Sequence, residues 1–81
     1  MKKKKDPELQ EEIRAKMKEI GKRVRMERKK VNNNYEDFAK DNNINKVTLA
    51  RIENGENFTI SSLIEVLKAL EISLPDFFND L

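Results

Sequence analysis

Few side chains in this chain could do covalent chemistry. The sequence has no cysteine and no histidine, so a thiol nucleophile, a cysteine-type zinc site and the commonest general base are all missing. Its two glycines leave no phosphate-binding loop of the usual kinds. The neighbouring carboxylates of Glu36 with Asp37, and of Glu53 with Glu56, fit helix-end and surface charges better than a catalytic pair. We therefore expect a binding domain, not an enzyme, with no cofactor and no metal.

The charged side chains are divided unevenly along the 81 residues. Residues 1–31 carry 13 basic and 6 acidic side chains, whereas residues 32–81 carry 4 basic and 9 acidic ones, so a net charge of +7 is followed by one of −5. A basic half suggests a polyanionic partner. No apolar run is long enough to span a membrane or to form a signal peptide, so we expect a soluble, cytoplasmic protein.

The spacing of apolar residues predicts an all-α fold of five helices. They are expected at about 7–30, 35–42, 46–54, 60–70 and 74–78, with residues 6–81 forming a single domain after a disordered basic tail at 1–5. In the first helix, Gly21 is a weak point that could divide it in two. The predicted inward residues are Leu9, Ile13, Met17, Ile20, Val24, Tyr35, Phe38, Ala39, Ile44, Leu49, Ile52, Ile60, Leu63, Ile64, Leu67, Leu70, Leu74, Phe77 and Phe78.

Short polar side chains mark where these helices begin. Five residues with a side-chain oxygen stand where the first backbone N–H groups of a helix need an acceptor, namely Asp6, Asn34, Asn45, Thr59 and Ser73. Asn43 suits a tight corner because asparagine tolerates the left-handed backbone conformation. Residues 34–54 thus outline two helices joined by a short turn, a helix-turn-helix. One side of helix 46–54 stays outside the core in this arrangement.

The chain resembles the lambda-repressor-like (Cro/repressor-type, XRE-like) helix-turn-helix domain, which implies a regulator of bacterial or phage type. The resemblance covers residues 18–79 and is carried by Ile20–Val24, Glu36–Ala39, Thr48–Gly55, Ser62–Leu70, Ile72–Leu74 and Phe78. The string Arg-Ile-Glu-Asn-Gly at 51–55 is its most specific part. The resemblance implies a compact five-helix fold that binds double-stranded DNA, with helix 46–54 entering the major groove. The helix at 7–17 precedes the family's usual start, so it extends the first helix.

The resemblance also implies roles for individual residues. Base-reading positions match Lys46, Val47 and Arg51, whose side chains suit guanine acceptors and the thymine methyl group. Positions that contact the backbone or the edges of bases match Tyr35, Asn45, Thr48 and Asn54. Arg28 and Glu53 match positions that commonly form a partly buried ion pair. Among the other cations, Lys29 and Lys30 are weaker candidates for phosphate contacts.

Several partners remain open at this stage. We expect a transcriptional regulator, repressor-like, that acts as a homodimer on two half-sites about 34 Å apart. One alternative is the antitoxin of a toxin–antitoxin pair, which binds both DNA and a protein toxin. Another is a protein-interaction module on the same frame without DNA binding. Contact with polymerase is also possible. The stripe of Leu9, Ile13 and Met17 fits either packing on its own domain or a seam with a partner.

Overall fold

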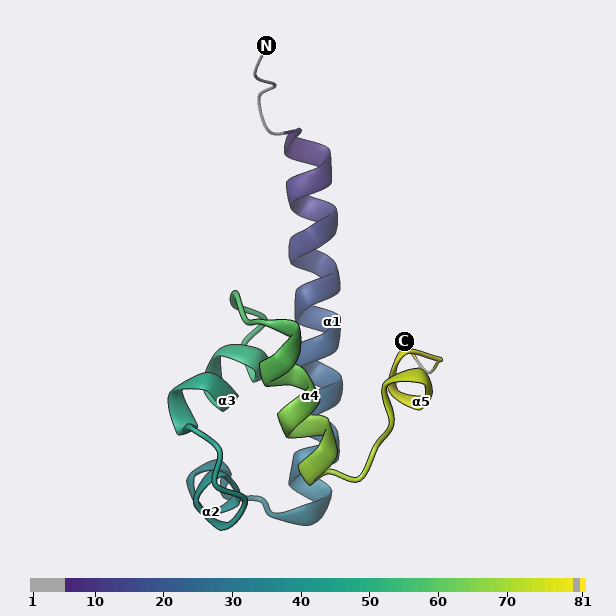
Figure 1. Cartoon of the computed structure of the whole chain (residues 1–81). Helices are drawn as coiled ribbons and strands as arrows, with labels where there is room; N and C mark the ends of the chain where they lie inside the picture. Colours follow the sequence, from purple (N-terminus) through teal and green to yellow (C-terminus); the bar gives the residue numbers. More distant parts are fainter. Residues whose placement is uncertain (1–5, 80) are drawn as a thin grey trace.

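Five helices account for the chain in the computed structural model, which describes residues 6–79 and 81. The predicted tail, residues 1–5, lies outside the described residues. The described part is all-α, with α1 at Pro7–Val31, α2 at Tyr35–Asp41, α3 at Lys46–Glu53, α4 at Ile60–Ala69 and α5 at Leu74–Asn79. Figure 1 shows α2, α3, α4 and α5 gathered around the C-terminal part of α1. The helices that the structure describes include none long and apolar enough to cross a membrane.

The helix starts confirm the predicted caps. Side-chain oxygens of Asp6, Asn34, Asn45, Thr59 and Ser73 accept hydrogen bonds from backbone N–H groups two or three residues ahead, at 2.8–3.2 Å. Each bond satisfies a donor that has no partner within the helix itself. The helix boundaries therefore follow from local side-chain chemistry.

The possible break of the first helix at Gly21 was wrong, because α1 runs unbroken from Pro7 to Val31. Gly21 is buried where the end of α3 crosses α1. A Cβ atom added at Gly21 would lie 2.7 Å from the backbone oxygen of Glu53, and closer still to that of Ile52. The missing side chain lets the two helix backbones approach each other. Gly21 thus serves packing and not flexibility.

The core lies between α1 and the four shorter helices. Its fully buried side chains are Val24, Phe38, Leu49, Ile52, Leu63, Val66, Leu67 and Phe77. The predicted inward stripe of α4 was partly wrong. Ile60 and Ile64 are 60% and 42% exposed, while Val66 is fully buried. The inward face of α4 consists of positions 63, 66, 67 and 70, so it keeps Leu63, Leu67 and Leu70 of the predicted stripe and has Val66 in place of Ile60 and Ile64.

Two aromatic side chains also differ from their predicted inward positions. Tyr35 and Phe78 are exposed, whereas Phe77 is fully buried. The ring of Phe77 meets that of Phe78 edge to face, with centroids 5.2 Å apart, and the guanidinium of Arg23 lies 5.4 Å from the Phe77 centroid. A helix of six residues turns only one such side chain fully inward, so its neighbour stays at the surface.

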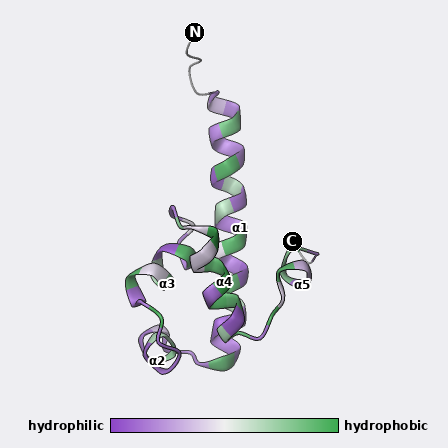
Figure 2. Ribbon diagram, in the orientation of Figure 1, coloured by the Kyte–Doolittle hydropathy of each residue, from purple (hydrophilic) through white to green (hydrophobic). Residues whose placement is uncertain are grey.

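The first turns of α1 project beyond the other helices, as Figure 1 shows. The molecule measures 48 × 26 × 19 Å, and its long dimension follows α1. Leu9 and Ile13 on this projecting segment are each 49% exposed. Figure 2 shows hydrophobic residues alternating with hydrophilic ones along it. The apolar stripe that is buried at Val24, after Gly21, thus continues half-exposed along the part of α1 that precedes Gly21.

Candidate nucleic-acid interface

The turn between α2 and α3 is built around Asn43. Its φ is +56°, in the left-handed region that asparagine tolerates, as predicted. The backbone N–H of Ile44 donates to the backbone oxygen of Ala39 at 2.8 Å, which closes the turn. Ala39 is buried, and its small side chain lets α3 cross close to α2. The turn at Asn43 and the close packing at Ala39 therefore set the angle between α2 and α3.

Helix α3 has a buried face and an exposed face. Leu49 and Ile52 are fully buried, whereas Lys46, Val47 and Arg51 are exposed. Val47 is 55% exposed, although an isolated apolar side chain on a short helix gains stability from burial. The structure thus brings the three base-reading candidates onto one outward face, with Ala50 half-buried between them.

Lys46 and Arg51 differ in whether their side chains form an ion pair. The Nζ atom of Lys46 lies 3.2 Å from Oε2 of Glu36, at the start of α2, and both side chains are exposed. Such an exposed pair contributes little and exchanges easily for another anion. Arg51 is exposed and forms no ion pair with any residue that the structure describes. Its guanidinium therefore keeps its hydrogen-bond donors available.

Asn45 and Thr48 lie at the N-terminal end of α3. The side-chain oxygen of Asn45 already accepts from the backbone N–H groups of Val47 and Thr48, at 2.8 and 3.2 Å. Asn45 therefore has a structural role, and only its amide NH₂ remains available for an outside partner. Thr48 is half-buried at the edge of the exposed face.

Arg28 and Glu53 meet in a buried, two-pronged ion pair. Nε and Nη2 of Arg28 donate to the two carboxylate oxygens of Glu53, each at 2.8 Å. Nη1 donates to the backbone oxygens of Asn32 and Asn33, at 3.1 and 2.9 Å. Hydrogen bonding to Glu53 raises the pKa of Arg28, although burial acts in the opposite direction. The pair ties α1 to the end of α3 and to the turn before α2.

Sequence reasoning missed Arg25, which it did not single out among the cations of the first helix. Its Nε donates to Glu53 at 3.3 Å, and its Nη2 donates to the side-chain oxygen of Asn54 at 2.9 Å. Arg25 precedes Arg28 by one helical turn, so both arginines face the same carboxylate. That spacing was the available signal, because the family resemblance already implied that Arg28 pairs with Glu53.

A hollow of about 350 Å³ lies between the end of α1, the start of α2 and the end of α3. Four residues with hydrogen-bond donors line it, namely Arg25, Lys29, Tyr35 and Asn54, together with Ala50 and with Arg28 and Glu53, which bind each other. The structure thus brings Tyr35 and Asn54, which were predicted to contact the DNA backbone or the edges of bases, together with the cations Arg25 and Lys29. Such a set suits one phosphate group.

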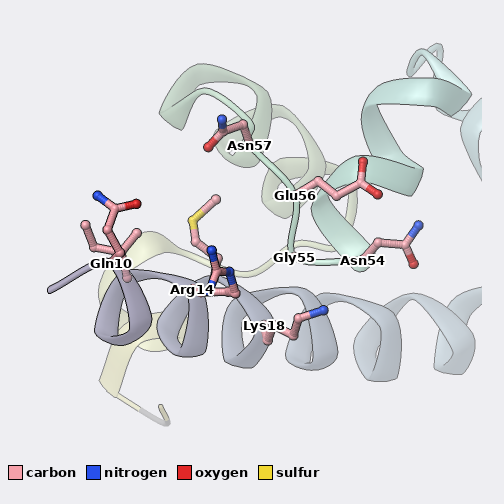
Figure 3. Close-up of a pocket in the computed structure, with 9 residues that line it drawn as sticks. Gln10, Arg14, Lys18, Asn54, Gly55, Glu56 and Asn57 are labelled. Atoms are coloured by element: carbon pink, nitrogen blue, oxygen red, sulfur yellow. The ribbon is translucent and has the colours of Figure 1, made fainter. Parts of the chain in front are cut away.

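A second hollow, of about 410 Å³, lies in the corner between the projecting part of α1 and the loop after α3. Figure 3 shows Gln10, Arg14 and Lys18 on α1 facing Asn54, Gly55, Glu56 and Asn57 on the loop. Gly55 has a φ of +73°, and an added Cβ would lie 2.9 Å from the Cα of Lys18. The loop can approach α1 here only because residue 55 has no side chain.

A family model for a helix-turn-helix matches residues 24–77, two thirds of the chain. The chain belongs to this helix-turn-helix family, which is XRE-like and lambda-repressor-like. Its members are DNA-binding regulatory domains, so the chain is a helix-turn-helix domain of a DNA-binding regulator. The match begins at Val24, so the projecting part of α1 precedes it. Comparison with curated proteins and with solved structures gives no match.

Proposed function

We propose that this helix-turn-helix domain recognises a specific sequence in double-stranded DNA and regulates transcription as a repressor. Helix α3 enters the major groove, where Lys46 and Arg51 donate to base acceptors and Val47 contacts a thymine methyl group. The observation that supports this reading is the outward face of α3. It leaves Val47 and Arg51 exposed while Leu49 and Ile52 anchor the opposite side.

The hollow beside α3 supplies the positioning contact. A backbone phosphate seated between Arg25, Lys29, Tyr35 and Asn54 fixes how deeply α3 enters the groove. Arg25 is already oriented by Glu53 and Asn54, so less side-chain entropy is lost when phosphate binds. On this reading Asn54 and Tyr35 contribute to register, and Lys46, Val47 and Arg51 to the choice of bases. Amide and hydroxyl groups of Asn45 and Thr48 contact the edge of the same site.

Selection of bound sequences from random duplex DNA tests this proposal. The expected result is a short enriched motif, arranged as two symmetric half-sites if the chain binds as a dimer. Binding to the motif should weaken steeply as salt rises, because each phosphate contact releases counterions from the DNA. This release favours binding less when the salt concentration is high. Enrichment of no motif, together with the absence of salt-sensitive binding to random duplex DNA, would instead support a protein-interaction module.

An antitoxin role is the second candidate, because the uncovered stripe on α1 offers a surface for a protein. Leu9 and Ile13 are half-exposed there, and they lie outside the part of the chain that matches the family. A toxin gene beside the gene for this chain, and a stable complex of the two products, would favour this role. Repression by the chain alone from the selected motif would favour the simple regulator.

A further inference from the structure

We propose that two copies of this chain pair through the projecting part of α1, in antiparallel orientation, with the two Ile13 side chains at the two-fold axis. The paired segment is the three turns around Leu9, Ile13 and Met17. The proposal rests partly on the proposed function, since one of its supports is the geometry that DNA requires of two α3 helices.

The uncovered stripe is the first support. Leu9 and Ile13 are each 49% exposed, and together with Met17 they line a shallow apolar hollow along α1. Their spacing of four residues keeps them on one side of the helix. Below them the same stripe is continued by Ile20 and the fully buried Val24. The segment is thus built like a core helix that none of the residues described in the structure fully covers.

The distribution of charge selects the orientation. Along this segment acidic residues come first and basic residues follow, as Asp6, Glu8, Glu11 and Glu12 and then Arg14, Lys16 and Lys18. Within the described chain, only Lys16 of this set forms an ion pair, with Glu19 at 3.7 Å. Antiparallel pairing places the acidic stretch of each copy beside the basic stretch of the second. Parallel pairing places like charges together, which is unfavourable.

Glu12 and Lys16 show how the flanks match. Both line the shallow hollow of the stripe, on the side of α1 away from the loop after α3. In an antiparallel pair with a two-fold axis, each flank of one helix meets the same flank of the second. Glu12 of one copy therefore comes near Lys16 of the other, and the contact occurs twice. The opposite flank carries Arg14, beside the corner hollow.

The side of α1 on which α3 lies agrees with an antiparallel two-fold pair. Helix α3 rests on α1 at Gly21, Arg25 and Arg28. At about 100° per residue, these positions lie about a quarter turn from the stripe of Ile13. An antiparallel two-fold pair then places both α3 helices on the same face of the dimer. A parallel pair would place them on opposite faces, where they could not reach one side of a duplex together.

The spacing of the two α3 helices agrees as well. The contacts at Gly21, Arg25 and Arg28 are centred about twelve residues along α1 from Ile13, and each residue adds 1.5 Å. Two copies that meet at Ile13 therefore hold their α3 helices about 35 Å apart along α1. Adjacent half-sites on one face of DNA are separated by about 34–36 Å. Arg14 and Lys18 lie on the same face as α3, between the two half-sites.

Sedimentation over a concentration series is the first experiment. Three turns of helix bury less surface than a standard interface, so we expect weak dimerisation, with a dimeric fraction that rises with protein concentration. Ile13→Asp should keep the chain monomeric without lowering its helix content in circular dichroism, because Ile13 is half-exposed. Met26→Asp is the matched control, since Met26 is 53% exposed on the same helix but off the stripe. Equal self-association of both variants would overturn the proposal.

Cross-linking tests the orientation, and the chain has no cysteine to interfere. Leu9→Cys and Met17→Cys variants are mixed and oxidised, free and bound to the selected DNA. Antiparallel pairing predicts disulfides mainly between position 9 of one chain and position 17 of another. Disulfides mainly between like positions would show a parallel pair and contradict the proposal, as would the absence of any cross-link under both conditions.

DNA with one or two copies of the selected half-site separates this proposal from the proposed function. Wild type should bind two half-sites cooperatively, best when their centres are one helical turn apart. Ile13→Asp should lose the cooperativity but bind a single half-site as wild type does. Specific binding to one half-site without cooperativity at any spacing would overturn the pairing and leave the function standing. Failure of wild type to bind any DNA, with mixed cross-links present, would overturn the function and leave the antiparallel contact standing.

Discussion

Arg28 of α1 and Glu53 of α3 bind each other through two hydrogen bonds of 2.8 Å, with both side chains buried. Nη1 of Arg28 donates two further hydrogen bonds, to the backbone oxygens of Asn32 and Asn33 in the turn before α2. A single guanidinium therefore connects α1, the end of α3 and the turn between α1 and α2. The orientation of α3 depends on this connection.

Glu53→Gln should lower the free energy of unfolding by about 3–5 kcal/mol, because Arg28 is then left buried without a countercharge. Urea unfolding at neutral pH measures the loss. Glu36→Gln is the control, since it breaks the exposed pair with Lys46 and should change stability by less than about 1 kcal/mol. Equal effects of the two variants would show that burial does not matter here.

The pH dependence of that loss follows from the raised pKa of Arg28. A cation whose pKa is higher in the folded state contributes its full stabilisation below its unfolded pKa, and loses it only as pH rises through the folded value. The difference in unfolding free energy between wild type and Glu53→Gln should therefore be the same at about pH 7 and about pH 10. Urea unfolding at both values checks this, and a difference that shrinks at the higher pH would contradict it.

Gly21→Ala should destabilise the protein by about 1–3 kcal/mol, because the new methyl group meets the backbone oxygens of Ile52 and Glu53. Helix propensity alone predicts the opposite, a gain of about 1 kcal/mol. Thermal and urea unfolding decide between the two. Lys22→Ala, at the exposed neighbouring position, serves as the control for changes in α1 that do not touch α3.

Arg51→Ala should weaken binding to the selected DNA by about 1–3 kcal/mol, or roughly 5–150-fold, and relax the preference at one base pair. Titration of the selected and of a scrambled duplex measures both effects. Lys68→Ala removes the same charge from an exposed position of α4 and should affect the two duplexes alike. A loss on the scrambled duplex as large as on the selected one would assign Arg51 to the backbone instead.

Lys29→Ala should weaken binding to selected and scrambled duplexes by similar factors, because a phosphate contact does not read sequence. The slope of log affinity against log salt should become shallower by about 0.9 if one phosphate contact is lost. Binding measured at several salt concentrations gives that slope. A loss confined to the selected duplex would mean that the hollow near Tyr35 holds a base and not a phosphate.

Much of the secondary structure could be predicted from the sequence because its signals are local. A cap such as Asn45 acts on backbone groups two and three residues ahead, and the corner at Asn43 depends on one residue's own backbone conformation. Family resemblance, whose most specific part is the string at 51–55, supplied the candidates Lys46, Val47 and Arg51. The spacing of Leu63, Leu67 and Leu70 was also sufficient to place α4.

Only the tertiary structure decided which surfaces meet. The sequence alone does not distinguish Gly21 as a break in α1 from Gly21 as a contact point, because the atoms that require a glycine lie some thirty residues away in Ile52 and Glu53. The same distance separates Arg25 from the carboxylate it shares with Arg28. Likewise, Val66 is buried in place of Ile64 because the helices around α4 determine its inward face. Local chemistry determines where each helix begins and ends, whereas packing between distant segments determines which side of it stays free to bind.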